Sequence, residues 1–231
     1  MASKSSLELV VNGTPFNAEK MVLISRAFSS DIRSEILALL AENPKGLGVS
    51  QIIEQIQEYS ESTISRNITE FLEKADLVAS RRDRQRKIKS LNPDYLVEYA
   101  GFLSSLSSLS SLSQEPISKV VLAKREGRRI TLGDSEGESF YPINFDEIAK
   151  IGKALDNGNR LNILAILQQG HVHESSLVYQ LSVSQPTINR HIRTLALSGL
   201  IKHKKGPGNT LYFNPDALTN YEAFVRYLAS R

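Results

Sequence analysis

The chain has 231 residues, of which 41% are hydrophobic and 23% are charged, a balance that is typical of globular domains. It contains no cysteine, which excludes disulfides, thiolate metal sites and cysteine nucleophiles. The net charge is a mild +3, no apolar run reaches the roughly 18 residues of a membrane helix, and the N-terminus lacks an apolar stretch of signal-peptide length, so we expect a cytoplasmic protein.

The first part of the chain predicts three helices, a hairpin and a fourth helix. Apolar residues spaced i, i+4, i+7 and i+8 within residues 31–40, and again within 64–72, mark one face of a helix. A shorter helix is expected around residues 52–56. Residues 77–91 predict two strands, and the Asn-Pro-Asp sequence at 92–94 then opens a last helix.

Residues 107–148 predict a connector. Leucine recurs at every third residue from Leu103 to Leu112 in a serine-rich run, which could extend the preceding helix on one side or form a linker, because serine has only middling helix propensity. Residues 119–132 predict a hairpin.

The second part of the chain repeats the first. Three groups of identical residues fall in the same order in both parts, which argues for two copies of one unit at about 22–106 and 149–231. The matched residues include Arg33 with Arg160, Ile36 with Ile163, Thr63 with Thr187, Arg66 with Arg190, Asn92-Pro93-Asp94 with Asn214-Pro215-Asp216, Tyr99 with Tyr221 and Phe102 with Phe224.

Helix, helix, helix, hairpin, helix is the order of a winged helix-turn-helix. We therefore predict a mostly helical α+β fold with two tandem winged helix-turn-helix domains. The expected boundaries are 1–106 for the first domain, 107–148 for the connector and 149–231 for the second domain. Ser60 and Ser184 stand where the third helix of each unit should be capped, because a hydroxyl there can accept a free amide.

The third helix of the second unit, VSQPTINRHIRTLALSGLI at 183–201, carries side chains suited to reading DNA. Between Ser184 and Lys205 there is no Asp or Glu, whereas an ordinary solvated helix face mixes both charges. Arg reads guanine, Asn and Gln read adenine, and Ser and Thr contact phosphate. The predicted DNA-contacting residues are Ser184, Gln185, Thr187, Asn189, Arg190, His191, Arg193, Lys202, Lys204 and Lys205.

The first unit has a mixed third helix and a strongly basic hairpin. Glu61, Glu70 and Glu73 lie in the helix, where acidic groups would weaken phosphate binding. The hairpin could follow the phosphate backbone or enter the minor groove, although a solubilising hairpin would have the same composition. The predicted contacts are Thr63, Ser65, Arg66 and Asn67 from the helix and Arg81, Arg82, Arg84, Arg86 and Lys87 from the hairpin, which also contains Lys89.

At these residues the sequence resembles the ArsR-type (arsenical-repressor-like) winged helix family. The resemblance rests on GNRLNILAIL at 158–167 and on the helix at 183–201, and it covers about 80 residues twice. It implies a dimeric DNA-binding repressor. Many members release DNA when cysteines bind metal, which is not implied here because the chain has no cysteine. Two copies in one chain look more like certain archaeal regulators.

Neither a catalytic site nor a metal site is predicted. The chain has no Gly-rich phosphate loop after a strand and no Gly-x-Ser-x-Gly motif. His171 and His173 lie on one side of an extended segment and could bind a metal, but no third ligand is evident, so surface histidines are the simpler interpretation. We expect a non-enzymatic protein without a cofactor.

The leading hypothesis is a transcriptional regulator that binds double-stranded DNA. The alternatives are a tandem winged-helix interaction scaffold, in which the third helix usually loses its basic face, and a basal transcription or replication-initiation factor. Apolar residues at 99–106 and 221–228 exceed what a small core needs. They predict an intrachain pair or a homodimer, and the leucine-spaced run favours a homodimer on a site with inverted symmetry.

Overall fold

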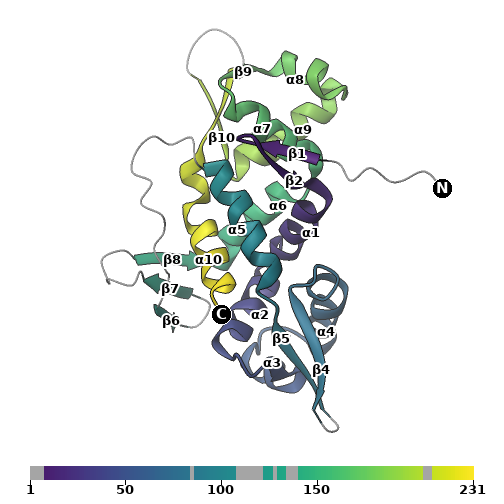
Figure 1. The fold of residues 1–231 in the computed structure, drawn as a ribbon, viewed down its shortest axis with the longest axis vertical. Helices are drawn as coiled ribbons and strands as arrows, with labels where there is room; N and C mark the ends of the chain where they lie inside the picture. Colours follow the sequence, from purple (N-terminus) through teal and green to yellow (C-terminus); the bar gives the residue numbers. More distant parts are fainter. Residues whose placement is uncertain (1–7, 84–85, 108–121, 127–128, 134–139, 205–209) are drawn as a thin grey trace, which may run out of the picture.

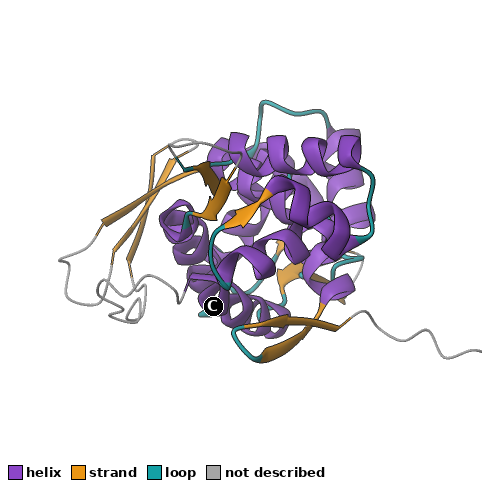
Figure 2. Ribbon diagram, turned by 90° about the horizontal axis from the view of Figure 1, so that it is seen from above, coloured by secondary structure: helices purple, strands orange, loops and turns teal. Residues whose placement is uncertain are grey.

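The computed structural model describes residues 8–83, 86–107, 122–126, 129–133, 140–204 and 210–231. The fold is mixed α+β, with the helices gathered in the centre and small sheets around them (Figures 1 and 2). Among the described residues, no helix is long and apolar enough to cross a membrane.

The first half begins with a hairpin and ends with a long helix. Its elements are β1 (Glu8–Val11), β2 (Thr14–Asn17), α1 (Ala18–Phe28), α2 (Asp31–Glu42), β3 (Leu47–Gly48), α3 (Val49–Gln55), α4 (Glu61–Asn67), η1 (Ile68–Leu72), β4 (Val78–Asp83), β5 (Arg86–Leu91) and α5 (Asp94–Ser107). β1 and β2 pair antiparallel, and β5 lies between β3 and β4 in an antiparallel sheet.

The predicted helix over 64–72 is divided in the structure. Ser60 caps α4 as expected, because its side chain accepts the Thr63 amide at 3.3 Å. The α-helix ends at Asn67 and continues as the π-helical turn η1. The chain then leaves this segment at Asp76, which has a positive φ of 56°.

Apart from one additional strand at its start and the different kinds and places of the short helices η1 and η2, the second half has the same elements in the same order. Its elements are β6 (Leu122–Glu126), β7 (Arg129–Gly133), β8 (Phe140–Asn144), α6 (Phe145–Leu155), α7 (Gly158–Gln168), β9 (Val172–His173), α8 (Glu174–Leu181), α9 (Gln185–Leu197), β10 (Ile201–His203), β11 (Thr210–Phe213), the 3-10 helix η2 (Pro215–Leu218) and α10 (Thr219–Ala229). β11 lies between β10 and β9, as β5 does between β4 and β3. Ser184 is at the N-cap position of α9, but its hydroxyl contacts the Thr187 hydroxyl at 3.0 Å and not a backbone amide.

The described residues of the segment before the second half form strands. The predicted hairpin at 119–132 is present as β6 and β7, and β8 adds a third antiparallel strand. The predicted boundary between residues 148 and 149 falls inside α6, which already begins at Phe145. Of the leucine-spaced run, Leu103 and Leu106 lie in α5, and the residues after 107 are outside the described part of the chain.

The helices α1 and α6, which are not among the predicted elements, are equivalent in the two halves. Each has 11 residues, and each is capped by an asparagine side chain, Asn17 accepting the Lys20 amide and Asn144 accepting the Asp146 amide. The segments NAEKMVLISRAF and NFDEIAKIGKAL can therefore be aligned from these caps, which places Lys20 opposite Glu147.

The two halves pack against each other through α1 against α6 and α5 against α10. The ring of Phe28 in α1 stacks on Tyr99 in α5, with centroids 6.1 Å apart. It meets Tyr221 and Phe224 of α10 edge to face. The hydroxyls of Tyr99 and Tyr221 are hydrogen-bonded at 3.0 Å, and Ser25 of α1 contacts the Tyr99 hydroxyl at 2.7 Å. One aromatic core therefore joins both halves.

This packing corrects the interpretation of the last helices. The apolar residues predicted to need a pairing partner are buried within one chain: Tyr99, Phe102, Leu103 and Leu106 in α5, and Tyr221, Phe224, Val225 and Leu228 in α10. The structure thus contains the intrachain pair. The later residues of the leucine-spaced run that favoured a homodimer, Leu109 and Leu112, lie outside the described residues, so that reason is not tested. Association of two whole chains stays a prediction.

The crossing of α1 and α6 depends on a glycine. A Cβ atom on Gly152 of α6 would lie 2.6 Å from the carbonyl carbon of Phe28 and 2.8 Å from the Ser29 amide nitrogen. Real Cβ atoms do not approach backbone this closely, so only glycine lets the two helices lie at this distance.

Candidate nucleic-acid interface

α9 has one buried face and one polar, cationic face. Ile188, His191, Ile192 and Leu195 are buried and form the inner face of the helix. The exposed side chains include Gln185, Asn189, Arg190 and Arg193, with Thr187 half-buried beside them. The helix contains no acidic residue, so the only charged side chains on its polar outer face are positive.

Two side-chain hydrogen bonds orient polar residues on this surface. The Gln185 side-chain amide donates to the Asn189 side-chain oxygen at 2.7 Å, which aligns two side chains capable of reading base edges. In the hairpin that follows, Lys202 and Lys204 are exposed, and Lys202 donates to the Asn214 side chain at 3.1 Å. Lys205, also predicted to contact DNA, lies outside the described residues.

The prediction that His191 faces DNA is wrong for this structure. His191 is only 3% exposed and lies on the inner side of α9, and neither of its ring nitrogens has a hydrogen-bond partner within the described part of the chain. Burial lowers the pKa of His191, and the positive charges of Arg160 and Arg190 lower it further. His191 is therefore a neutral core residue and not a phosphate ligand.

The outer face of α4 is less cationic than that of α9. Thr63 and Arg66 are exposed and Ser65 is half-buried, as the prediction requires. Arg66, however, forms an ion pair with Glu70 at 2.9 Å. Asn67 is 9% exposed, because its side chain accepts from Arg33 and donates to the Thr63 carbonyl. Asn67 is thus a second predicted contact that belongs to the core.

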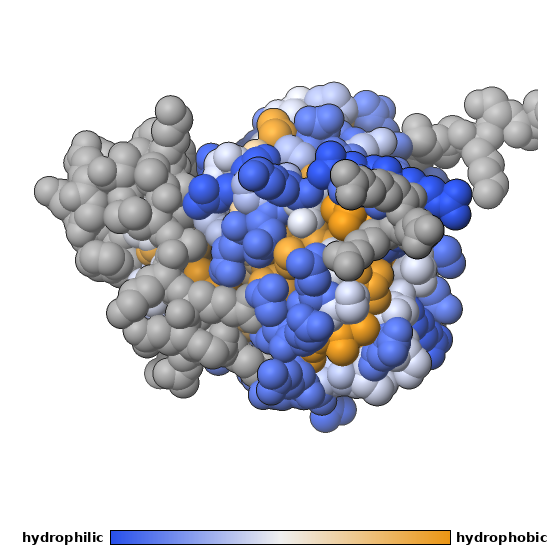
Figure 3. Space-filling view, turned by 90° about the horizontal axis from the view of Figure 1, so that it is seen from below, coloured by the Kyte–Doolittle hydropathy of each residue, from blue (hydrophilic) through white to orange (hydrophobic). Residues whose placement is uncertain are grey.

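The first hairpin presents part of its predicted basic surface. Arg82 and Lys87 are exposed and lie opposite each other in the register of β4 and β5. Arg81 is also exposed and donates to the Lys45 carbonyl at 2.7 Å. Arg86 belongs to β5, and Arg84 lies outside the described residues. Seen from this end of the molecule, the surface is mostly hydrophilic (Figure 3).

Lys89 does not contribute to that surface. It is 2% exposed and turns inward, where its ammonium group pairs with Glu73 and donates to the Ser80 hydroxyl at 2.7 Å. The nearby ammonium and hydroxyl hold the pKa of Glu73 below its usual range, although partial burial opposes this shift. One of the three acidic residues that seemed to weaken the first surface is therefore neutralised by a residue of the hairpin itself.

Two arginines that the sequence analysis matched, without giving them a role, hold the helix-turn-helix segments in place. Arg33 donates to the carbonyls of Arg26 and Ala27 at the end of α1, each at 2.9 Å. Arg160 does the same at the end of α6, at 2.8 Å to Lys153 and 2.7 Å to Ala154. Cations are favourable at helix C-termini, so each arginine fixes the angle between two successive helices.

The histidines before α8 have structural roles. His173 is the N-cap of α8, and its Nδ1 accepts the Ser175 amide at 3.3 Å. The His171 ring lies 5.7 Å from that of Tyr212. Across the described residues, no group of three or more His, Cys, Asp or Glu side chains could hold a metal ion.

The comparisons with known proteins point to the same segment. Residues 157–203, which run from the cap of α7 to the end of β10, match the family model described as "Bacterial regulatory protein, arsR family". Comparison with curated proteins and with solved structures returned no significant match. The chain thus contains an ArsR-type helix-turn-helix, a domain that suggests DNA-binding transcription regulation.

Proposed function

We propose that the protein is a transcription regulator in which two winged helix-turn-helix units of one chain form a pair and bind double-stranded DNA. The observation that carries this proposal is the outer face of α9. It is exposed and free of acidic residues, and it continues into a basic hairpin within the segment that matches the ArsR family. These are the side chains that bind phosphates and read base edges in the major groove.

The second unit of the proposal is supported by the first half of the chain. The order of α2, α3, α4, β4 and β5 matches α7, α8, α9, β10 and β11, and Arg33 makes the same contacts as Arg160. Dimeric repressors of the ArsR type use the first and last helices of the domain as their interface. Here α1 and α5 of one half meet α6 and α10 of the other.

The two DNA-binding surfaces differ. Arg66 and Arg190 are equivalent residues, but Arg66 is paired with Glu70, whereas the residue equivalent to Glu70 is Thr194, whose hydroxyl bonds the Arg190 carbonyl. We therefore assign sequence reading mainly to α9 and phosphate binding mainly to the hairpin of the first half. The target is then a site with two unlike halves, in place of the inverted repeat that a homodimer would require.

The experiment uses a matched pair of substitutions. After an operator has been selected from random DNA, we expect Arg190→Ala to cost about 1–3 kcal/mol of discrimination against other sequences, because a good base contact is worth that much. Arg66→Ala should change discrimination much less, because Glu70 already neutralises that side chain. Equal operator affinity for wild type and Arg190→Ala would contradict the proposal.

The alternatives predict other results. An interaction scaffold built from winged helices would show no selective enrichment of any DNA sequence. A basal transcription or replication factor would bind DNA, but genome-wide mapping would place it at most promoters or at origins and not at a small set of operators. The acid-free face of α9 favours DNA binding over the scaffold.

A further inference from the structure

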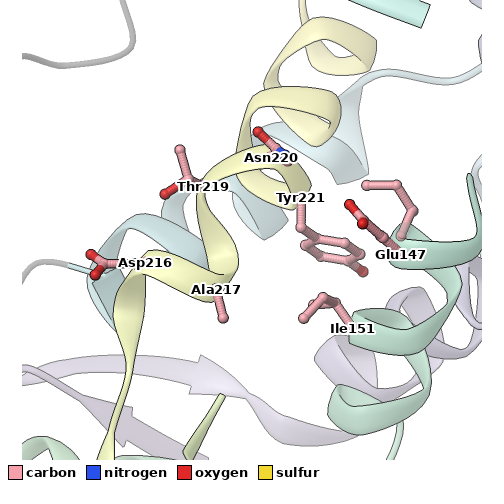
Figure 4. A pocket seen from close by; sticks show the side chains of 8 residues that line it. Glu147, Ile151, Asp216, Ala217, Thr219, Asn220 and Tyr221 are labelled. Atoms are coloured by element: carbon pink, nitrogen blue, oxygen red, sulfur yellow. The ribbon is translucent and has the colours of Figure 1, made fainter. Parts of the chain in front are cut away.

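The second half has an open pocket at a place that is filled in the first half. The pocket has a volume of about 320 Å³ and lies between α6 and the segment formed by η2 and α10 (Figure 4). Ile151 and the ring of Tyr221 border it beside the small side chain of Ala217, and Glu147 lies next to the Tyr221 ring. Binding pockets for small molecules begin at about this size and combine apolar walls with a few polar groups.

The equivalent place in the first half is occupied by the protein's own side chains. The match between Asn92-Pro93-Asp94 and Asn214-Pro215-Asp216 places Tyr95 opposite Ala217. Tyr95 packs against the core, and the Lys20 ammonium lies 4.4 Å from the centroid of its ring. Lys20 is also paired with Glu98. An aromatic ring with a cation beside it therefore fills the groove between α1 and α5.

In the second half both the ring and the cation are missing. Ala217 replaces Tyr95, Glu147 replaces Lys20 and Asn220 replaces Glu98. Glu147 and Asp216 are the charged side chains that line the pocket, and neither is ion-paired within the described residues. Two full negative charges outweigh the partial positive charges of the neighbouring helix N-termini. Compared with the first half, the pocket is therefore without the aromatic ring of Tyr95 and the positive charge of Lys20.

We propose that this pocket binds a small aromatic amine. The ring takes the space that Tyr95 fills in the first half, against Ile151 and Tyr221, and the ammonium group faces the Glu147 carboxylate. A ligand of this kind would provide in the second half the aromatic ring and the cation that Tyr95 and Lys20 provide in the first half. The ring fills the pocket, and the carboxylate provides the selectivity for a cation.

The pocket is connected to the proposed DNA-binding surface. Ala217 lies 3.7 Å from the position that a Cβ on Gly199 would take, and Gly199 forms the turn between α9 and β10. Asn214, just before η2, donates to the Gly199 carbonyl at 2.8 Å and accepts from Lys202. A ligand against Ala217 therefore touches the segment that positions α9 and its hairpin. An effect on DNA binding rests on the proposed function, whereas ligand binding does not.

The binding test uses the intact chain, which contains no tryptophan. Tryptamine can be excited selectively, and its fluorescence anisotropy should rise with protein concentration and saturate. Indole-3-propionate, which has the same ring and a negative charge, should bind much more weakly. Glu147→Gln should weaken tryptamine binding about two- to fivefold, as expected for the loss of one exposed ion pair.

Two further variants test the geometry. Ala217→Tyr should abolish tryptamine binding by supplying the ring that the first half has. Glu147→Lys, at an exposed position, should reverse the preference towards indole-3-propionate. The control is Glu98→Gln in the first half, where Glu98 is the equivalent of Asn220. This variant should leave tryptamine binding unchanged.

Three results would each overturn the proposal: absence of saturable binding, equal binding of both indoles, or insensitivity of binding to Ala217→Tyr and Glu147→Lys. DNA binding measured without any indole reports separately on the proposed function.

Discussion

Asn67 and His191 occupy equivalent positions in the two halves, but only Asn67 has hydrogen-bond partners among the described residues. The Asn67 side chain accepts a hydrogen bond from Arg33 at 3.2 Å. The His191 ring is buried near Arg160 without a hydrogen-bond partner among the described residues. An unsatisfied buried polar group costs about 1–3 kcal/mol, so the second half is the less well optimised at this position.

The lowered pKa of His191 predicts a loss of stability in mild acid. As the pH falls through the ordinary histidine pKa of about 6.5, the unfolded chain binds a proton that the folded chain does not, so the free energy of unfolding decreases. His191→Asn removes this effect and offers Arg160 the acceptor that Arg33 has. We expect thermal unfolding between about pH 7.5 and about pH 5.5 to be less pH-dependent in the variant than in wild type. An unchanged pH dependence would show that His191 is not buried as a neutral ring.

These two residues also show where sequence reasoning is limited. The repeat correctly aligned the third helices, and Arg190, Asn189 and Gln185 are exposed as predicted. His191 and Asn67 were assigned to the DNA side because they are polar. The helical spacing does place them on the buried face, since His191 lies with Ile188, Ile192 and Leu195, and Asn67 lies with Ile64 and Ile68. What the spacing does not show is the Arg33 side chain of another helix that gives Asn67 its hydrogen bond.

At the scale of elements, the crossing of α1 and α6 should be the most sensitive contact between the halves. Gly152→Ala places a methyl group against the backbone of Phe28 and should destabilise the protein by about 1–3 kcal/mol. Gly101→Ala is the control, because Gly101 is exposed in the middle of α5 and its added Cβ would meet nothing within 4 Å. It should stabilise by about 0.5–1 kcal/mol. Chemical denaturation of both variants tests whether the same substitution has opposite signs.

The basic hairpin of the first half should act mainly through phosphates. Replacing Arg82 and Lys87 with alanine should weaken binding to all DNA sequences about equally, and should lower the slope of log affinity against log salt by about one unit for each phosphate that the variant no longer neutralises. Replacing Lys150 and Lys153, two exposed cations of α6, removes the same charge elsewhere. If both pairs change the slope alike, only net charge matters and the hairpin is not a specific contact.

The helices and strands differ in how clearly their sequences predict them. The hairpins at 77–91 and 200–213 and the helices beginning at Asp31 and Gly158 follow from apolar spacing and turn residues. The helices α1 and α6 were missed although their apolar residues have helical spacing, as in Phe145, Ile148, Ile151 and Leu155, because the identical residues that define the repeat begin only at Arg33 and Arg160. The π-helical turn after Asn67 was also missed, since the apolar spacing of 64–72 is that of an ordinary α-helix.

At the scale of the whole molecule, the buried aromatic core between α5 and α10 predicts a protein that does not need a second chain. Light scattering at micromolar concentration should give a mass near the 25.7 kDa of one chain, both free and, after subtraction of the DNA, in the complex. A mass of two chains would restore the homodimer and require an interface outside the helices described above.

The joining of two unlike halves by one covalent chain also has a consequence for the arrangement of a promoter. A symmetric dimer on a palindrome looks the same from either direction along the DNA. Under the function proposed above, a chain with an acid-free helix at one end and a partly neutralised one at the other makes its DNA site asymmetric. Inverting the operator would then present a different protein surface to whatever approaches from the side of the gene, so orientation itself becomes a regulatory signal.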